Sequence, residues 1–287
     1  MKLVSMIRSG RAGVGLILSD GVLDLSQRIQ AGSLREVLVR GLLPKVATFM
    51  GEAPDCGLDE VRYLPAVTDP AHIFCVGTNY RDHLKEVQDA GIARQEPTHP
   101  ALFIRYPETM VGHQECLAMP AGSVQYDYEA ELAVIIGVGG RFIRREDASH
   151  HIAGYACFND GSVRDWQFHT QQVTAGKNFM ASGALGPWMV TADEVPDCGN
   201  LSISCRLNGK VMQQSNTSQF IFDVPHLISY ISQVLPLVPG DVIATGTPHG
   251  VGFSRKPPVF MAADDVCEVE IERIGVLRNR VASADPP

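Results

Sequence analysis

The chain has 287 residues with a formal net charge of -8, and 45% of its residues are hydrophobic while 20% are charged. This is the composition of an ordinary globular protein that is long enough for one large domain, or for a large and a small one. The acidic balance and the lack of a basic stripe argue against nucleic acid as a partner, and no apolar run reaches the roughly 18 residues of a membrane helix.

The seven cysteines are scattered along the chain and include no Cys-x-x-Cys pair. An odd number of unpaired cysteines favours free thiols in a reducing compartment over a disulfide framework or a zinc site. The apolar stretch at the N-terminus is too short for a secretory signal peptide. We therefore expect a cytoplasmic protein with no membrane association.

Residues 1–68 are predicted to form a small N-terminal α/β domain. Short strands are expected at 3–7 and 14–18, and a turn at 19–21 leads into a further strand at 22–25. Ser33 precedes a helical pattern that begins at Leu34, where its hydroxyl can cap the helix. The proline-bounded segment 65–70 is expected to connect this domain to the rest of the chain.

Residues 69–287 are predicted to form the main domain, which is mostly β with a few helices. Strands are expected at 73–76, 132–136, 201–207, 210–213, 241–245 and 266–271, and a helix at 224–234. The dipeptide Asn208-Gly209 between two strands predicts a type I′ hairpin. Strands and helices do not alternate regularly, which argues against a Rossmann or TIM-barrel architecture.

Three carboxylates are candidates for a metal site. Glu129 and Glu131 lead into the apolar strand 132–136, and side chains two apart on a strand point to the same face. Such a pair repels itself and is costly to bury, so a cation between the two would stabilise it. Asp160 is a candidate third ligand. Oxygen ligands favour Mg²⁺, Mn²⁺ or Ca²⁺ over zinc, and the alternative is a pair of glutamates on a solvated face.

A histidine and a glutamate in the segment after the first strand of the main domain could act together. If the stretch that contains them is helical, His83 and Glu86 share a face, and the carboxylate would orient the imidazole as a general base requires. The alternative is an exposed ion pair of little energetic weight. The polar stretch 87–100 that follows is either a lid over a site or an ordinary surface loop.

Other polar residues could bind an acidic substrate. Lys177 follows a glycine without the pattern of a P-loop, and it could bind a carboxylate or stabilise an oxyanion, or be merely solvated. Arg164 and Gln167 could donate hydrogen bonds to a substrate acid. The turn 240–248 is rich in glycine and hydroxyls, so it is either an anion-binding nest or a tight structural turn.

In their sequences and in their order along the chain, these segments together resemble the fumarylacetoacetate hydrolase family. The resemblance is to its longer two-domain members of the acylpyruvase and 2-hydroxyhepta-2,4-diene-1,7-dioate isomerase type. The resemblance runs from about Ile73 to the end of the chain and is much less specific over the first 65 residues. The matching segments are Gly77-Thr78-Asn79-Tyr80-Arg81-Asp82-His83, Asp127-Tyr128-Glu129-Ala130-Glu131-Leu132, Gly154-Tyr155 with Asn159-Asp160, Arg164-Asp165, Gly176-Lys177, Gly186-Pro187-Trp188, Asn208-Gly209, and Pro239-Gly240-Asp241 with Thr245-Gly246-Thr247-Pro248.

The resemblance implies a mixed β-roll catalytic domain that is usually a homodimer. It implies that Glu129, Glu131 and Asp160 hold Mg²⁺ or Mn²⁺, and that the catalytic residues are His83, Glu86 and Lys177, with the first two on a lid. The substrate-binding residues that it implies are Tyr80, Arg164, Gln167 and Thr247. One departure is Val163, where many members have alanine, and it leaves the metal ligands unaffected.

The function implied is metal-dependent hydrolysis of a carbon–carbon bond in a 2,4-dioxo acid, to give pyruvate and a carboxylic acid. Acylpyruvates of aromatic catabolism, such as maleylpyruvate or fumarylpyruvate, and sugar-derived diketo acids fit this scheme. His83, oriented by Glu86, would deprotonate a water, and Lys177 would stabilise the oxyanion. The alternatives are a decarboxylase or isomerase of a 2-oxo or 2-hydroxy-dienoic diacid at the same site, and, more remotely, a non-catalytic metabolite-binding protein.

Overall fold

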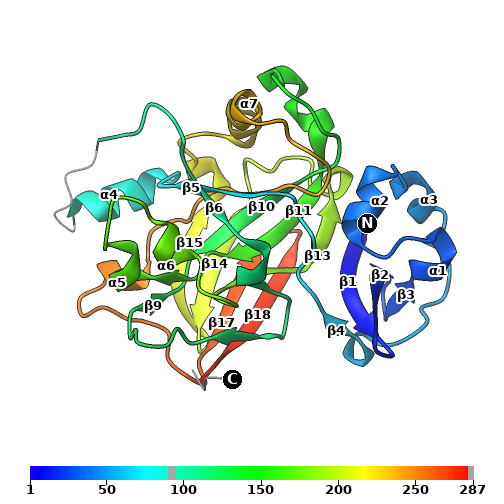
Figure 1. The fold of residues 1–287 in the computed structure, drawn as a ribbon, viewed down its shortest axis with the longest axis horizontal. Helices are drawn as coiled ribbons and strands as arrows, with labels where there is room; N and C mark the ends of the chain where they lie inside the picture. Colours follow the sequence, from blue (N-terminus) through cyan, green and yellow to red (C-terminus); the bar gives the residue numbers. More distant parts are fainter. Residues whose placement is uncertain (90–94, 284–287) are drawn as a thin grey trace.

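The computed structural model describes residues 1–89 and 95–283. Within these residues, two β-sheets dominate the fold and short helices lie at their edges (Figure 1). The larger sheet has the strand order β3-β2-β1-β13-β11-β10-β16-β5-β6, and β4 and β7 pair at its side. Its strands are β1 (Lys2–Arg8), β2 (Arg11–Ile17), β3 (Val22–Asp24), β4 (Arg62–Tyr63), β5 (Ile73–Gly77), β6 (Ala101–Arg105), β7 (Met110–Val111), β10 (Ala130–Ile136), β11 (Ile152–Asn159), β13 (Gly183–Thr191) and β16 (Val242–Ala244).

The second sheet has the order β15-β14-β17-β18-β8, and a short pair joins β12 to β9. These strands are β8 (Cys116–Ala118), β9 (Tyr126–Asp127), β12 (Ser162–Val163), β14 (Ser202–Leu207), β15 (Lys210–Asn216), β17 (Val266–Ile271) and β18 (Gly275–Ala282). The helices are α1 (Ser26–Ile29), α2 (Leu34–Val39), α3 (Leu43–Ala47), α4 (Arg81–Asp89), α5 (Arg164–Gln167), α6 (Thr174–Lys177) and α7 (Val224–Val234). The prediction of a mainly β fold with few helices is confirmed.

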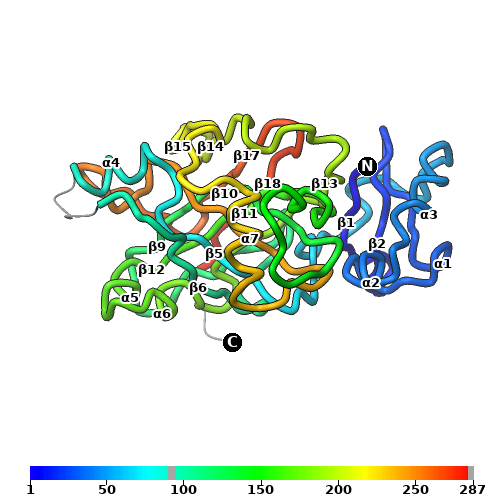
Figure 2. The backbone as a smooth tube through the Cα atoms, turned by 90° about the horizontal axis from the view of Figure 1, so that it is seen from above, coloured from blue at the N-terminus to red at the C-terminus, as the bar shows by residue number. Residues whose placement is uncertain are grey.

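The N-terminal segment lies at one end of the molecule, beside the body formed by the rest of the chain (Figure 2). Its strand β1 pairs antiparallel with β13, with Lys2 opposite Val190 and Leu3 opposite Met189. One sheet therefore extends across the predicted boundary between the two domains, and the boundary at residue 68 stays a prediction. The predicted cap of α2 is present, because the Ser33 side chain accepts a hydrogen bond from the Glu36 amide.

Strand β10 is buried on both faces, which explains its unbroken apolar sequence. Leu132 and Val134 pack in the cluster that includes the residues of the second sheet and α7. Ala133 and Ile135 pack in another cluster, together with apolar residues of the N-terminal segment such as Leu16. The strand that carries the two glutamates is thus fixed by packing from both sides.

Local predictions in the second half of the chain are also confirmed. Asn208 and Gly209 have φ values of 52° and 78°, the left-handed pair that a type I′ turn requires. Helix α7 has the predicted bounds, and the Asp223 side chain caps it by accepting a hydrogen bond from the His226 amide.

All seven cysteines are free. Over the described part of the chain, none of the helices combines the length and apolar character that a membrane crossing needs.

Candidate active site

The three predicted metal ligands meet at the end of two neighbouring strands. Glu129 directly precedes β10, Glu131 lies within it, and Asp160 follows β11. Because β10 and β11 are antiparallel with Ala130 opposite Asn159, the start of one strand meets the end of the other. One carboxylate oxygen of each ligand lies within 4.8 Å of the others, and none of the three side chains is more than 6% exposed.

Three cationic side chains surround these carboxylates. Lys177 Nζ lies 2.7 Å from Glu129 Oε2 and 2.6 Å from Asp160 Oδ2. Arg164 Nη2 lies 2.6 Å from the other Glu129 oxygen, Oε1. On the far side of the cluster, Arg105 Nη1 lies 2.6 Å from Asp160 Oδ1. All three cations are almost fully buried. They pair with Glu129 and Asp160, because a carboxylate inside a protein needs a partner of opposite charge.

A fourth carboxylate, Asp127, binds Arg164 Nε at 2.9 Å. The four carboxylates and three cations leave one negative charge in surplus, and it falls on Glu131. Burial and the negative charges of Asp160 and Glu129 raise the pKa of Glu131 well above its usual range. Burial also raises the pKa of Glu129, but Lys177 and Arg164 outweigh it and bring the value to about 2.

The residues therefore fit a divalent cation. Glu131 Oε2 accepts a hydrogen bond from the Gly246 amide at 2.8 Å, and among the described residues no cationic side chain forms an ion pair with it. A hard ion bound by Glu129, Glu131 and Asp160 would relieve the repulsion in a site made of oxygen donors. This donor set suits Mg²⁺, Mn²⁺ or Ca²⁺ and does not choose among them.

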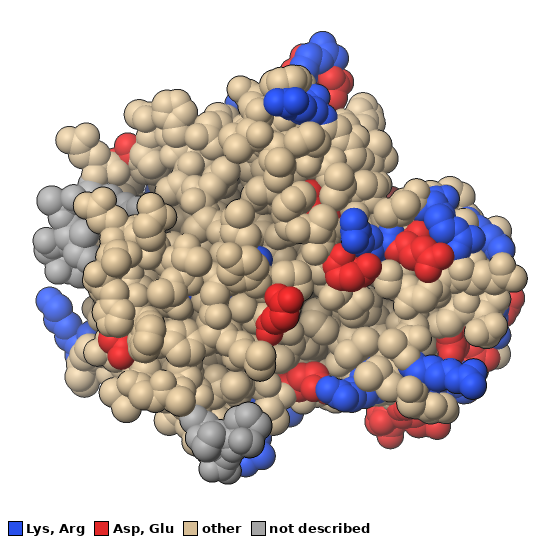
Figure 3. Space-filling view, in the orientation of Figure 1, with Lys and Arg blue, Asp and Glu red and all other residues tan. Residues whose placement is uncertain are grey.

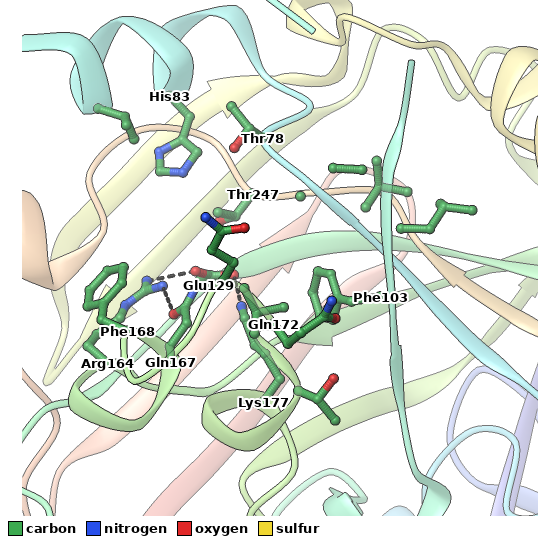
Figure 4. Close-up of a pocket in the computed structure, with 18 of the residues that line it drawn as sticks. Thr78, His83, Phe103, Glu129, Arg164, Gln167, Phe168, Gln172, Lys177 and Thr247 are labelled. Atoms are coloured by element: carbon green, nitrogen blue, oxygen red, sulfur yellow. Dashed lines mark hydrogen bonds and ion pairs between the residues drawn. The ribbon is translucent and has the colours of Figure 1, made fainter. Parts of the chain in front are cut away.

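His83 and Glu86 form the predicted pair on helix α4. His83 Nδ1 lies 2.9 Å from Glu86 Oε2, while Glu86 Oε1 accepts hydrogen bonds from the Gly250 amide at 2.8 Å and the Ser254 hydroxyl at 2.6 Å. Burial raises the pKa of Glu86, but these partners together lower it, so the side chain stays a carboxylate. Because Nδ1 faces Glu86, the other ring nitrogen is left for the cavity (Figure 4).

Helix α4 is also attached to the body through the residue next to His83. Asp82 Oδ2 accepts a hydrogen bond from the Ser215 hydroxyl at 2.6 Å and lies 2.9 Å from His249 Nδ1. The pair is thus held in place by contacts within the protein. The lid was predicted over residues 87–100, and its segment 90–94 lies outside the described residues.

A cavity of about 360 Å³ joins the histidine to the carboxylates. This volume is in the range of small-molecule sites. Figure 4 shows the two opposed sides of the cavity, with His83 on one and Glu129 and Lys177 on the other. Seven of the predicted site residues line it: His83, Glu129, Glu131, Arg164, Gln167, Lys177 and Thr247. Other lining residues include Val76, Leu102, Phe103, Phe168 and Gln172.

Tyr80 is not brought to the cavity, in contrast to its predicted role in substrate binding. Its side chain is fully buried in the core and packs edge-on against Phe220, with 4.9 Å between the ring centroids. Tyr80 directly precedes α4, and burial together with the negative charges of Glu131 and Asp82 raises the pKa of its hydroxyl well above the usual range. Glu86 does not line the cavity either and reaches it only through His83.

Two residues of the site were missed from the sequence. Arg105 lies at the end of β6, 55 positions before Asp160, and nothing local in the sequence connects the two. Asp127 lies in the segment around Glu129 that resembles the family, but the sequence did not indicate a role for it in the site. Its buried carboxylate binds Arg164 and accepts hydrogen bonds from the amides of Gly252 and Phe253, so it joins the site to the loop that follows β16.

The chain is similar to several known proteins. The mitochondrial oxaloacetate tautomerase FAHD2A of Bos taurus is 45% identical over 224 residues, which cover 77% of this chain and 70% of that protein. The solved fumarylacetoacetate hydrolase of Exiguobacterium antarcticum is 36% identical with a TM-score of 0.85, and the match covers 99% of both chains. The maleylpyruvate hydrolase of Sphingobium sp. SYK-6 is 26% identical with a TM-score of 0.82 and covers 99% of this chain and 100% of that one.

The maleylpyruvate hydrolase is also known in complex with manganese(II) and pyruvate. The bovine relative is mitochondrial by name, so the cytoplasmic location expected for this chain stays a prediction. The family model for the C-terminal region of fumarylacetoacetate (FAA) hydrolase matches residues 72–282 of this chain. With three quarters of the chain matched and the buried carboxylate cluster in place, the protein belongs to the fumarylacetoacetate hydrolase family.

Proposed function

We propose that the protein is an enzyme that interconverts the keto and enol forms of a 2-oxo acid such as oxaloacetate. The observation that carries this proposal is the cavity that His83 shares with the carboxylate cluster, since a base and a cation site then face one substrate. Tautomerisation moves a single proton and needs no nucleophilic water. The bovine relative at 45% identity, an oxaloacetate tautomerase by name, supports this choice.

A divalent ion held by Glu129, Glu131 and Asp160 would act as a Lewis acid toward the keto and carboxylate oxygens of the substrate. His83 would take the proton from the carbon next to the keto group, since Glu86 fixes the tautomer that leaves its cavity-facing nitrogen basic. The imidazolium would then give this proton to the keto oxygen, which completes the enol.

Arg164 and Gln167 would hold the substrate acid. Arg164 Nη1 donates to Gln167 Oε1 at 2.8 Å, which leaves the amide N–H groups of Gln167 free to donate into the cavity. Lys177 and Thr247 line the same cavity. The ammonium of Lys177 would stabilise negative charge as it develops on the keto oxygen.

Hydrolysis of an acylpyruvate is the second candidate, as expected from the sequence. The same His83–Glu86 pair could activate a water, and the similarity to a maleylpyruvate hydrolase that has been solved with pyruvate favours this substrate class. Decarboxylation or isomerisation of related diacids would use the same residues. A purely metabolite-binding role is less well supported, because none of the ligands and neither member of the pair is replaced.

The test is a comparison of reactions on metal-stripped protein with and without added Mg²⁺ or Mn²⁺. Decay of the enol absorbance of oxaloacetate would report tautomerisation, and pyruvate released from a panel of acylpyruvates would report hydrolysis. Metal-dependent acceleration of enol decay without pyruvate release supports the tautomerase. Pyruvate release with no effect on enol decay would replace it by the hydrolase, and loss of CO₂ from oxaloacetate would indicate the decarboxylase.

We also propose that the protein is a homodimer. Figure 3 shows a broad face with few charges over β6, α5 and α6, while acidic and basic side chains gather over the N-terminal segment. The side chain of Asn178, which neighbours Phe179, is hydrogen-bonded to the backbones of Ile104 and Tyr106. Trp166 packs edge-on against Phe179, and a hydrogen bond between Ser123 and Asp165 joins the segment of Val124 to that of Trp166. These contacts bring exposed apolar residues together. We call them the apolar face: Ile104, Tyr106, Val124, Trp166 and Met180, which are 39% to 80% exposed. Contiguous exposed apolar surface of this kind is typical of an interface between proteins.

A further inference from the structure

Lys177 occupies the space between two of the proposed metal ligands. Its ammonium lies 2.7 Å from Glu129 Oε2 and 2.6 Å from Asp160 Oδ2, and its side chain is only 3% exposed. A single positive charge thus bridges two carboxylates inside the protein, where water screens it little. This is the electrostatic task that a bound cation would otherwise perform.

The outer oxygens of the same two carboxylates are also engaged. Arg164 lies against Glu129 Oε1, and Arg105 lies against Asp160 Oδ1. Each arginine thus contacts the carboxylate oxygen that Lys177 does not, and Arg105, unlike Arg164, does not line the cavity. Glu129 and Lys177 both line the cavity, so an ion that enters from it would meet the ammonium at Glu129 Oε2. The two like charges would repel each other strongly in this buried position.

An alternative partner for the ammonium lies close by. Lys177 Nζ is 5.2 Å from the centroid of the Phe103 ring, and Phe103 lines the cavity. The face of an aromatic ring attracts a cation within about 6 Å. The ammonium can therefore leave the carboxylates and still keep a favourable contact on the cavity wall.

We propose that Lys177 is a counter-ion that keeps the ligands assembled without metal and opposes metal binding. Ion entry displaces its ammonium from Glu129 and Asp160 toward Phe103, where it faces the anionic substrate. The inference rests on the metal site of the proposed function and adds an order of events, in which the ion binds before Lys177 becomes available to the substrate. Lys177 thereby links occupation of the metal site to affinity for the acid.

The test measures the Kd for Mn²⁺ by titration calorimetry and by the electron paramagnetic resonance signal of free Mn²⁺, on the full chain stripped of metal. Lys177→Met removes the charge and keeps an unbranched side chain that is one atom shorter, and we expect it to bind Mn²⁺ on the order of tenfold more tightly than the wild type. Lys177→Arg keeps the charge and should show no such gain. Lys85→Met removes the same charge from an exposed position on α4 and should leave the Kd unchanged.

Each outcome bears on the proposal. Unchanged or weaker Mn²⁺ binding by Lys177→Met would overturn it, because a lysine that only positions the ligands gives that result. A variant that is unfolded alone but folds when Mn²⁺ is added supports it, since the ion then replaces the lost charge, whereas one that stays unfolded at saturating Mn²⁺ contradicts it. If the wild type binds no Mn²⁺, the metal site itself is wrong, which separates this failure from that of the counter-ion.

Discussion

His83 Nδ1 lies 2.9 Å from Glu86 Oε2, and the second oxygen of Glu86 is fixed by the Gly250 amide and the Ser254 hydroxyl. The imidazole is therefore oriented through a chain of contacts that begins in the loop after β16, far from α4 in sequence. The same loop binds Asp127 through its backbone amides. One loop thus holds both the base and the arginine partner of the metal ligands.

The first prediction concerns this pair. His83→Ala should lower turnover by roughly 10² to 10⁴-fold, the usual contribution of a general acid or base, and should leave the Kd for Mn²⁺ unchanged. Glu86→Gln should lower turnover less, since the imidazole remains. It removes the charge that supports the imidazolium and one of the two acceptor oxygens that hold His83 and the Gly250 amide. Steady-state kinetics and calorimetry on the two variants check this, and turnover retained by His83→Ala would remove the histidine from the mechanism.

The second prediction concerns the surplus charge on Glu131. Glu131→Gln keeps an acceptor for the Gly246 amide but removes the charge that burial and the neighbouring carboxylates oppose. We expect the metal-free variant to be at least as stable toward denaturant as the wild type. We also expect it to lose stabilisation by Mn²⁺, which should reach about 2.7 kcal/mol in the wild type at a hundred times the Kd. Equal stabilisation of both proteins by Mn²⁺ would exclude Glu131 as a ligand.

Elements whose signal is local could be predicted from the sequence, and those set by distant contacts could not. The hairpin at Asn208, the cap at Ser33 and helix α7 depend on neighbouring residues, and the structure has them where the sequence placed them. The pairing of β1 with β13 joins residues nearly 190 positions apart, and no local pattern encodes it.

The residues of the candidate site also include some that local sequence predicts and others that only distant contacts bring together. The shared face of Glu129 and Glu131 follows from strand periodicity, so the convergence of the pair could be predicted. The family resemblance supplied Asp160, and the structure brings it to the pair. Arg105 has an ordinary position at a strand end, and only the fold brings it to Asp160. Tyr80 lies in a matching segment, but segment similarity does not report which way a side chain points.

Arg105 provides the third prediction. Its guanidinium is buried and binds Asp160, the Gly161 carbonyl and the Ser182 hydroxyl. Arg105→Met leaves a buried carboxylate without one of its two cations, and breaking such a pair typically costs about 3–5 kcal/mol of the free energy of unfolding. Arg105→Lys keeps the charge but cannot make all of the hydrogen bonds of the guanidinium, which also include one from Nε to the Thr109 hydroxyl, and it should lose less. Denaturant unfolding of the metal-free proteins measures the difference, and a loss below about 1 kcal/mol, typical of an exposed pair, would contradict the assignment.

The fourth prediction tests the homodimer. Met180 is 76% exposed on the apolar face, so Met180→Glu would bury a charge in the interface and should shift the protein toward monomer. Val39→Glu is the matched control, because Val39 is 59% exposed on α2, in the N-terminal segment. Sedimentation velocity over a range of concentrations distinguishes the variants. A wild type that is monomeric throughout, or a Met180→Glu variant as dimeric as the control, would rule out this face.

The last prediction is a dependence of stability on pH that originates at His113. Burial and the nearby Arg278 charge lower the pKa of His113 to about 4, and its neutral Nδ1 accepts a hydrogen bond from the Arg278 amide at 3.1 Å. Between this value and about 6.5, the ordinary pKa of histidine, the unfolded chain binds a proton that the folded protein does not. The contribution of neutral His113 to the free energy of unfolding should therefore be fully present above pH 6.5. It should be lost as the pH drops through this window. Urea titrations of the wild type and of His113→Asn, which keeps an acceptor but cannot titrate, isolate this effect. Parallel pH profiles of the two proteins would contradict it.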